Sequence, residues 1–280
     1  MRIKRKLSRL RLIRFKHLTA GIIIFMMLFS GINVLAADRQ IVSEPVIVKE
    51  IVEQKGNKTL KFPIFMYHNS AEEEPANPDG LYDPDLFVKP SEFEKQIEYL
   101  IENNYTFCIF DDWYDLYDIK KPVFITFDDG YLENYTEIFP ILKKYNVKIT
   151  IFLVTDPHKE IKLTPKMIRE MSDSGLVKFE SHTLTHVNLT DISSDDERLT
   201  DELKNSKSEI EQITGRRVYA IAYPSGRFDN AVEDKTKEFY QFGVTTIWGM
   251  HKTNISNYEI RRMSIGRGMT IDDFIKLLNK

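Results

Sequence analysis

Titratable side chains stand directly after three of the apolar runs in this 280-residue sequence. One carboxylate and two imidazoles together form a ligand set for a divalent cation that leaves positions open for water and substrate. A further carboxylate remains that can act as a base, so the residue types predict a metal site with a general base beside it. The apolar runs are 62–67, 122–127 and 176–180, and the groups that follow them are His68, Asp128, Asp129, His182 and His186.

The spacing within these groups suits a division of labour. Adjacent residues on an extended segment point to opposite sides, so Asp128 and Asp129 are expected to take different tasks, one as a ligand and one as a base. His182 and His186 lie four residues apart and can meet one ion if the segment forms a helical turn. Each piece alone also fits an ordinary turn or a pair of surface histidines. Their combination at strand ends favours chemistry.

The elements that must position these groups alternate along the chain. Apolar, β-rich runs are separated by helical patterns, which predicts parallel β-α units and a barrel-like α/β fold. In such folds the catalytic groups collect at the carboxyl ends of the strands. The predicted strands are 62–67, 105–110, 122–127, 147–154, 176–180, 218–223 and 243–248.

Four helices are predicted from their capping residues. Ser or Thr three residues before an acid, or Thr before Pro, marks each start. The predicted starts are Ser91 with Glu94 for a helix to about Asn103, Thr164 with Pro165 for a helix closed by Gly175, Ser194 with Glu197 for a helix to about Ile213, and Thr270 with Asp273.

The near-neutral net charge of −3 conceals two differently charged regions. Residues 1–36 hold eight of the 39 basic side chains and none of the 42 acidic ones, which leaves 31 basic against 42 acidic in the rest. Residues 18–37 are uncharged, so residues 1–37 are predicted to be a signal peptide or an N-terminal membrane anchor. Either alternative places a stalk at 38–60 and a domain at 61–280 outside the cytoplasmic membrane. An acidic body argues against nucleic acid as a partner.

The remaining composition describes a packed domain without disulfides. A hydrophobic share of 42% excludes a largely disordered chain. Cys108 is the single cysteine and lies in an apolar run, so it is expected to be a buried, inert thiol. His158 and His251 have no partner pattern and are expected to be solvated.

Three ordered motifs resemble those of the polysaccharide deacetylase family (carbohydrate esterase family 4, the NodB homology domain). They are 126–130 (TFDDG), 181–186 (SHTLTH) and 222–226 (AYPSG), within a match that covers roughly residues 62–280. The resemblance implies a distorted (β/α) barrel of about seven parallel strands and metal-dependent removal of N-acetyl groups from glycans. It implies Asp129, His182 and His186 as metal ligands, Asp128 as the general base, and the Tyr131 backbone N–H as an oxyanion donor.

Two departures from the family pattern point to one subgroup. Ala222 stands where the family's third motif has Arg, and no histidine follows His251 to supply the usual general acid. Both features resemble the poly-N-acetylglucosamine deacetylases, which read Ala-Tyr-Pro there and carry an early Met-Tyr-His. On that resemblance His68 is the general acid, and Arg262 is hypothesised to supply the missing guanidinium.

The expected activity is an extracellular N-deacetylase that acts on poly-N-acetylglucosamine. Peptidoglycan, chitin oligomers and O-acetylated xylan remain alternative substrates, and a catalytically silent wall-glycan-binding module is the alternative from another class. The metal is expected to be one divalent ion, zinc first, with cobalt, nickel or iron as alternatives. We expect a monomer, secreted or anchored to the outer face of the membrane. The residues expected at the substrate are Tyr67, Tyr131, Tyr223, Pro224 and Trp248.

Overall fold

The polypeptide folds around a closed ring of seven parallel strands, here described from a computed structural model. Residues 59–73, 83–156 and 162–279 are described. The ring strands are β2 (Ile64–Tyr67), β6 (Pro122–Asp129), β7 (Ile149–Leu153), β8 (Val177–Ser181), β9 (Ala220–Ala222), β10 (Phe242–Trp248) and β12 (Ile260–Ser264). Their order is β2-β12-β10-β9-β8-β7-β6, and pairing of β2 with β6 closes the ring. The expected barrel of about seven parallel strands is therefore confirmed.

The membership of the ring differs from the prediction in one strand. β5 (Thr106–Cys108), from the predicted run 105–110, pairs only with the first residues of β6 and lies outside the ring. Its place is taken by β12, which the sequence reading missed because two adjacent arginines interrupt a five-residue strand. The other strands are the antiparallel pair β1 (Lys61–Phe62) with β11 (His251–Lys252) and the parallel pair β3 (Asn69–Ser70) with β4 (Phe87–Val88).

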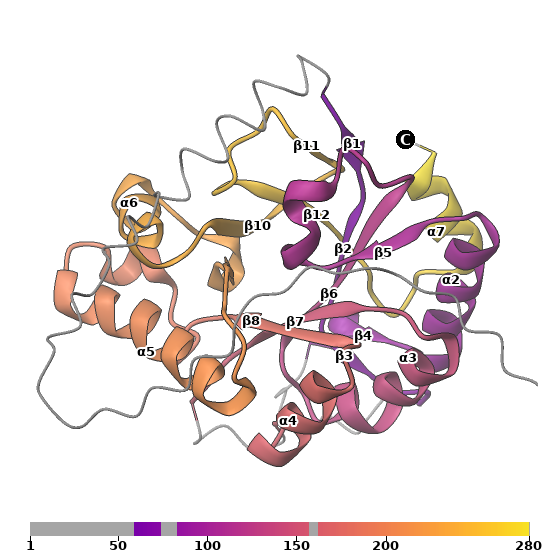
Figure 1. Cartoon of the computed structure of the whole chain (residues 1–280), viewed down its shortest axis with the longest axis horizontal. Helices are drawn as coiled ribbons and strands as arrows, with labels where there is room; N and C mark the ends of the chain where they lie inside the picture. Colours follow the sequence, from indigo (N-terminus) through magenta and orange to yellow (C-terminus); the bar gives the residue numbers. More distant parts are fainter. Residues whose placement is uncertain (1–58, 74–82, 157–161, 280) are drawn as a thin grey trace, which may run out of the picture. The chain divides into compact units, whose positions relative to one another are not determined.

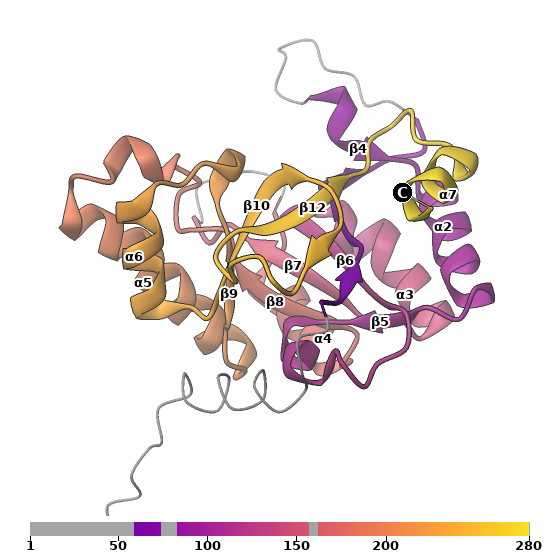
Figure 2. The same ribbon diagram turned by 90° about the horizontal axis from the view of Figure 1, so that it is seen from above.

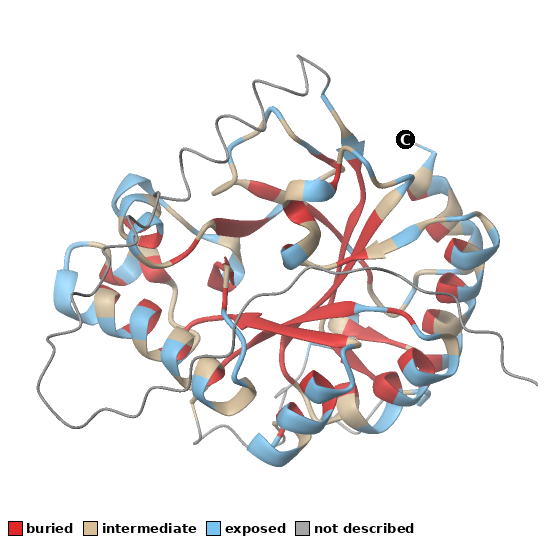
Figure 3. Cartoon of the chain, viewed as in Figure 1, coloured by how far each residue is buried: buried red, intermediate tan, exposed pale blue. Residues whose placement is uncertain are grey.

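Helices cover the outer face of the ring (Figure 1). Their inward sides are buried and their outward sides exposed (Figure 3), as amphipathic helices require. Seen from above, β10 and β12 lie beside each other, and α5 and α6 pack together on one side (Figure 2). The helices are α2 (Pro90–Glu102), α3 (Phe139–Tyr145), α4 (Pro165–Asp173), α5 (Asp196–Thr214), α6 (Asn230–Phe239) and α7 (Ile271–Leu278).

Two of the predicted caps are confirmed. The Thr164 side chain accepts a hydrogen bond from the Met167 N–H at the start of α4. The Thr270 hydroxyl accepts from the Asp273 N–H and donates to the Asp273 carboxylate at the start of α7. Each interaction satisfies an N–H group that the first helical turn leaves without a partner.

Two other predicted caps are wrong, although their helices exist. α2 begins at Pro90 after Lys89, and the Ser91 hydroxyl donates to Glu72 instead of capping. α5 is capped by Asp195, one residue after the expected Ser194. Local sequence offered two adjacent capping residues in the second case, and the chain uses the carboxylate.

Side chains on the ring strands alternate between two hydrophobic cores. Residues such as Ile125 and Phe127 pack outward against the helices. Their neighbours, such as Phe124 and Phe152, fill the interior of the ring together with Phe110 and Trp113, which follow β5. Because Asp128 shares the parity of Phe124 on β6, its carboxylate is directed into the interior.

His251 contradicts the expectation of a solvated imidazole. It is fully buried on β11, with its ring centroid 5.6 Å from that of Phe62 and 5.5 Å from that of Trp113. Burial lowers its pKa from 6.5 to about 4, and the positive charge of Arg261 acts in the same direction. The folded protein therefore holds a neutral imidazole over a pH range in which the unfolded chain is protonated.

Acid is consequently expected to destabilise the fold through His251. Between pH 6.5 and 4 the unfolded chain binds more protons than the folded protein. The free energy of unfolding is therefore unaffected by the titration of His251 above pH 6.5 and decreases by about 3 kcal/mol as the pH falls to 4. His251→Phe removes the titration, so urea unfolding of this variant should depend less steeply on pH than that of the wild type. Parallel pH profiles of the two proteins would contradict the assignment.

The predicted leader 1–37, most of the predicted stalk 38–60, and His158 lie outside the described residues. Within the described part of the chain, no helix has both the length and the apolar character needed to cross a membrane. Cys108 is buried, and burial raises the pKa of its thiol to about 12, which fits the expected inert thiol.

Candidate active site

Asp129, His182 and His186 converge at the carboxyl ends of β6 and β8. Each offers one ligand atom, and these three atoms lie within 4.8 Å of one another. The Asp129 Oδ1 lies 3.7 Å from the His182 Nε2 and 3.4 Å from the His186 Nε2. These separations suit atoms that share one cation with ligand bonds of about 2.0–2.2 Å. The donor set and its geometry therefore fit a divalent metal ion.

Hydrogen bonding orients His182 for this task. Its Nδ1 lies 2.7 Å from the Ala222 carbonyl oxygen, and because a carbonyl only accepts, the proton is on Nδ1. The other ring nitrogen, Nε2, lies toward Asp129. A second hydrogen bond of this kind commonly fixes the tautomer of metal-binding histidines. Ala222, at which the third motif departs from the family pattern, thus contributes its backbone carbonyl to the site.

Left-handed backbone conformations place both ligand segments. Asp129 and Gly130 have φ of 72° and 74°, and Thr183 and His186 have φ of 68° and 62°. The segment between the two histidines is a bend without helix, so their convergence does not depend on the helical turn that their spacing would allow. A side chain at Gly130 would also collide with Leu153 on β7. Such conformations persist only where surrounding contacts enforce them.

Glu202 supplies those contacts for the histidine segment. This buried residue of α5 accepts hydrogen bonds from the Leu184 and Thr185 N–H groups at 3.0 and 2.9 Å and from the Thr185 hydroxyl at 2.5 Å. The sequence analysis missed Glu202, although an acid on the apolar face of a helix, one residue before Leu203, was a signal that could have been used.

Glu202→Ala is expected to weaken metal binding by about 10–100-fold, the usual cost of losing a group that orients a ligand. Glu202→Gln keeps an acceptor for the two N–H groups and should recover part of the affinity. Metal titration of the chelator-stripped protein measures both effects, with the exposed neighbour substitution Asp201→Ala as the control. Equal affinities in Glu202→Ala and the control would show that α5 does not hold the segment.

Asp128 forms a two-pronged ion pair with Arg262 inside the barrel. The two guanidinium nitrogens donate to the two carboxylate oxygens at 2.6 and 2.7 Å. Arg262 also donates to the Thr245 carbonyl and the Thr126 hydroxyl, and both charged side chains are almost fully buried. The arginine hypothesised from the missing third-motif arginine therefore lies against Asp128, although it comes from β12.

This ion pair controls the charge state of Asp128. Burial alone would raise the pKa of Asp128, but the Arg262 charge, followed by the effects of His182, the Arg262 hydrogen bonds and His68, outweighs burial. The pKa consequently lies well below its ordinary value of 3.8, and the carboxylate is ionised at neutral pH. The pKa of Asp129 is lowered as well, against its burial, by His182 and Lys162.

His68 lies on the other side of Asp128, after β2. Its Nε2 is 3.9 Å from the Asp128 Oδ2, which is an ion-pair distance but too long for a hydrogen bond. Burial lowers the pKa of His68, and the charges of Asp128 and Asp129 oppose that effect. The Asn134 amide donates to the His68 carbonyl oxygen at 3.1 Å and fixes this turn. His68 is thus near both acids without being bonded to either.

Lys162 holds the turn that follows β6. Its ammonium donates to the Asp129 carbonyl oxygen at 2.8 Å and lies 4.2 Å from the Tyr131 ring centroid. The Leu163 N–H also donates to the Gly130 carbonyl oxygen at 3.1 Å. Tyr131 is half-buried beside the ligands, as its expected position requires. Residues 162–163 therefore hydrogen-bond to the backbone of the Asp-Asp-Gly turn and hold it in place. The sequence analysis did not identify this interaction.

Two of the residues expected at the substrate are unavailable to it. Tyr67 is fully buried, stacks on Phe127 at 5.0 Å and donates its hydroxyl proton to Gln96. Tyr223 is also fully buried and stacks on Phe228. Their rings belong to the outward core because their strand positions face the helices, so the prediction of sugar contacts is wrong for both.

The other two residues lie at strand ends. Pro224 is buried in a short turn after β9 that ends at Gly226, where a side chain would collide with Thr246. Trp248 closes β10 opposite Arg262 in the sheet register and is 52% exposed. The structure thus brings nine of the eleven expected residues to the carboxyl end of the barrel or its rim and assigns the two tyrosines to the core.

The fold and this site define the class of the protein. A seven-stranded parallel barrel carries an Asp-His-His cluster and a buried, charge-paired carboxylate at the carboxyl ends of its strands. These features are those of a barrel hydrolase.

The comparison with known proteins narrows the class to a family. Residues 117–245 match the family model described as polysaccharide deacetylase. A crystal structure of a polysaccharide deacetylase from Bacillus cereus superposes with a TM-score of 0.72 at 35% identity, over 79% of this chain and 69% of that one. The chain belongs to the polysaccharide deacetylase family, and it is a hydrolase that acts on amide bonds.

Curated relatives carry names that state two kinds of substrate. The poly-β-1,6-N-acetyl-D-glucosamine N-deacetylase of Staphylococcus epidermidis is 28% identical over 64% of this chain and 68% of its own length. The peptidoglycan-N-acetylmuramic acid deacetylase PdaA of Bacillus subtilis is 31% identical over 58% of this chain and 57% of its own length. The chain is thus similar to deacetylases of two different polysaccharides.

Proposed function

We propose that the protein is an extracellular, metal-dependent N-deacetylase of N-acetylglucosamine polymers, with poly-N-acetylglucosamine as the favoured substrate. The observation that carries this proposal is the buried pair of Asp128 with Arg262, since it supplies an ionised carboxylate beside the Asp-His-His cluster. The early Met66-Tyr67-His68 and the Ala222-Tyr223-Pro224 patterns support the poly-N-acetylglucosamine subgroup.

In the proposed mechanism, Asp129, His182 and His186 hold the metal, expected to be zinc. A divalent cation there would supply Lewis acidity, lowering the pKa of a bound water and polarising the acetyl carbonyl. Asp128 accepts the proton of the attacking water, and Arg262 keeps this carboxylate ionised and holds both of its oxygens. The Tyr131 N–H donates to the carbonyl oxygen as negative charge develops on it.

His68 completes the reaction as the proton donor. Amide cleavage releases an amine, which is a poor leaving group until its nitrogen is protonated. The 3.9 Å gap between His68 and Asp128 supports separate roles, because a hydrogen-bonded pair would tie the donor to the base. The exposed fraction of the His186 side chain, 32%, against 2% for His182, indicates that substrate approaches from the His186 side.

The charge of the chain supports a neutral polymer and a location outside the cell. The residues after 36 carry an excess of acidic groups, which would repel an anionic cell wall at long range and attract the polycation formed by deacetylation. The basic, then apolar, N-terminal segment supports export, followed by cleavage or retention as an anchor.

Acetate release from a substrate panel tests this proposal. The panel contains poly-β-1,6-N-acetylglucosamine, peptidoglycan, chitin oligomers and O-acetylated xylan, each with the intact chain, after chelation, and after addition of Zn²⁺ or Co²⁺. We expect release from the first polymer, loss on chelation and recovery with metal. Faster release from peptidoglycan would overturn the substrate, release that survives chelation would overturn the metal role, and binding without release would favour the silent module.

A further inference from the structure

A cavity lies at the opposite end of the barrel from the active site. Its volume is about 630 Å³, within the range of roughly 300–1,000 Å³ typical of small-molecule sites. The segments that line it include Tyr219 directly before β9, Gln241 directly before β10 and Tyr258 shortly before β12. These are the amino ends of the strands whose carboxyl ends approach the catalytic groups. None of the residues assigned to catalysis or metal binding lines this cavity.

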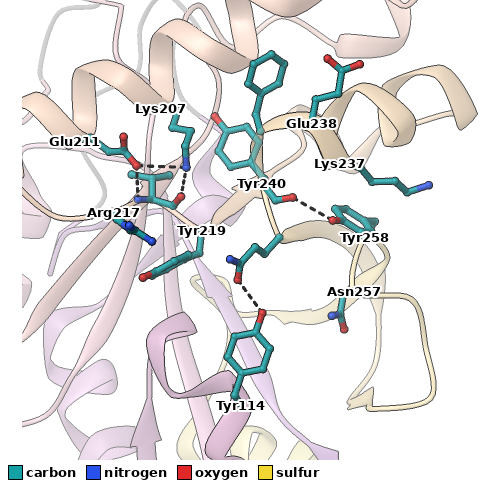
Figure 4. A pocket seen from close by; sticks show the side chains of 13 residues that line it. Tyr114, Lys207, Glu211, Arg217, Tyr219, Lys237, Glu238, Tyr240, Asn257 and Tyr258 are labelled. Carbon is teal, nitrogen blue, oxygen red and sulfur yellow. Dashed lines mark hydrogen bonds and ion pairs between the residues drawn. The ribbon is translucent and has the colours of Figure 1, made fainter. Parts of the chain in front are cut away.

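Tyrosine rings dominate the walls of this cavity, which we call the tyrosine groove. Figure 4 shows Tyr114, Tyr219, Tyr240 and Tyr258 around it. Tyr114, Tyr219 and Tyr258 are half-buried, whereas Tyr240 is 3% exposed. These three partly exposed rings come from three separate segments of the chain, and each keeps part of its surface in contact with solvent. A tyrosine with a solvent-exposed edge combines an apolar ring face with a polar hydroxyl group, and such side chains are common in binding surfaces.

The rings are held in place before any ligand arrives. The Tyr114 hydroxyl donates to the Gln241 side-chain oxygen at 2.8 Å, and the Tyr258 hydroxyl donates to the Tyr240 carbonyl oxygen at 3.1 Å (Figure 4). The ammonium of Lys178 lies 4.7 Å from the Tyr219 ring centroid. Lys178 is buried, whereas Tyr219 is half-buried and lines the groove. Fixed rings reduce the entropy cost of binding.

The charges around the groove are largely paired, which argues for a neutral ligand. Lys207 lies 3.3 Å from Glu211 and donates to the Val218 carbonyl oxygen, and Lys237 lies 2.9 Å from both Glu233 and Asp234. An anion would have to compete with these carboxylates for each ammonium. A sugar ring needs no net charge, since its axial C–H groups pack on aromatic faces while its hydroxyls bond to amides and carboxylates such as Asn257 and Glu238.

We infer that the tyrosine groove is a second glycan-binding site, which takes a short stretch of a hexosamine polymer by stacking on Tyr219 and Tyr258. This inference rests on the proposed function for the identity of the polymer. A polymer bound at the amino end of the barrel does not compete with the catalytic cluster at the carboxyl end. The second site therefore retains the polymer between turnovers, which raises the local concentration of the remaining acetyl groups.

The experiment measures the number of binding sites in an inactive protein. The Asp128→Asn chain is titrated by calorimetry with β-linked N-acetylglucosamine oligomers and with their de-N-acetylated counterparts, so that the two forms of the polymer are distinguished. We expect two oligomers per chain. Tyr219→Leu with Tyr258→Leu should weaken the groove site about tenfold per ring lost, from the usual worth of an aromatic contact, and leave one oligomer per chain.

Tyr99→Leu on α2 serves as the matched control, because Tyr99 is also half-buried but lies outside the groove. Thermal melting of every variant separates loss of binding from loss of folding, and the single Tyr258→Leu variant is retained if the double variant melts early. Unchanged stoichiometry in the groove variants would overturn the inference, as would binding of inorganic phosphate there without binding of oligomers. The chain could release no acetate from any glycan and still bind one oligomer, with that binding lost in the groove variants. In that case the proposed function would fail and this site would stand.

A functional readout follows from the same variants. Acetate release from long polymers should slow more than release from a trimer, because only the long chain reaches both ends of the barrel. Equal slowing of both substrates would point to damage at the active site and contradict a separate polymer site.

Discussion

Asp128→Asn is expected to lower the rate of acetate release by about 10²–10⁴-fold, the usual contribution of a general base. The amide has the same size as the carboxylate but cannot accept the proton of the attacking water. The proposed metal ligands Asp129, His182 and His186 remain, so metal content should stay at that of the wild type. Steady-state kinetics together with metal analysis of the purified protein measure both quantities.

The exposed substitution Asp173→Asn at the end of α4 is the control for a change of one carboxylate. Wild-type turnover in Asp128→Asn, with the metal retained, would remove Asp128 from the mechanism. Loss of metal together with activity would instead mean that Asp128 supports the cluster, and the base would have to be sought elsewhere.

Arg262→Met is expected to cost about 3–5 kcal/mol of folding free energy at neutral pH, because it leaves the buried Asp128 carboxylate without its counter-charge. The hydrogen bonds to Thr126 and to the Thr245 carbonyl are lost as well. Activity should fall with stability, since Asp128 would no longer be held ionised and oriented. Urea unfolding of the chelator-treated protein measures the stability term without a bound metal.

The pH dependence of this loss identifies its cause. In the wild type the pKa of Asp128 is lowered by Arg262, so the stabilisation from the pair is present above the unfolded pKa of 3.8 and is lost only as pH falls below it. In Arg262→Met the carboxyl group has a raised pKa and can be protonated at low pH. The difference between the two proteins should therefore shrink from pH 7 toward pH 4.

Two further variants make this prediction specific. Asp128→Asn combined with Arg262→Met removes both charges and should be more stable than Arg262→Met alone, since no buried charge is left unpaired. Arg261→Met, the neighbouring position on β12, should have a small effect because that side chain is partly exposed. A stability loss in Arg262→Met that is independent of pH and unrelieved by Asp128→Asn would attribute the loss to packing alone.

The ligand cluster could be predicted from sequence because its members lie at recognisable strand ends. Asp128 and Asp129 close an uninterrupted apolar strand, and His182 and His186 follow another, so the parallel arrangement alone brings them to one end of the barrel. The bend that replaces a helical turn between the histidines could not be predicted, because it depends on Glu202, 16 residues beyond His186 in the chain and on another element.

The strand that carries Arg262 could not be predicted by the same rule. Hydrophobic periodicity identifies strands by their apolar side chains, and β12 has two adjacent arginines among five residues. Arg262 is tolerated inside the barrel only because Asp128, Thr126 and the Thr245 carbonyl lie around it. These partners come from two other strands, and only the closed ring brings them together.

Tyrosine roles divide in the same way. Tyr67 and Tyr223 stand next to motif residues, which favoured substrate contact, yet strand parity directs both rings into the core. Tyr219 and Tyr258 carry no motif and were not singled out, yet they line the tyrosine groove. Adjacency in sequence does not fix the side of a strand that a residue faces, whereas the sheet does.

The sequence alone therefore determined the barrel class, the Asp-His-His cluster and the carboxylate beside it, because these follow from local patterns repeated at strand ends. Only the tertiary structure decided which strand closes the ring, which charge accompanies Asp128, and which aromatic rings face solvent. Those features depend on contacts between segments far apart in the chain. The strength of the charge interactions among these contacts depends on burial, which cannot be determined from the order of residues in the sequence.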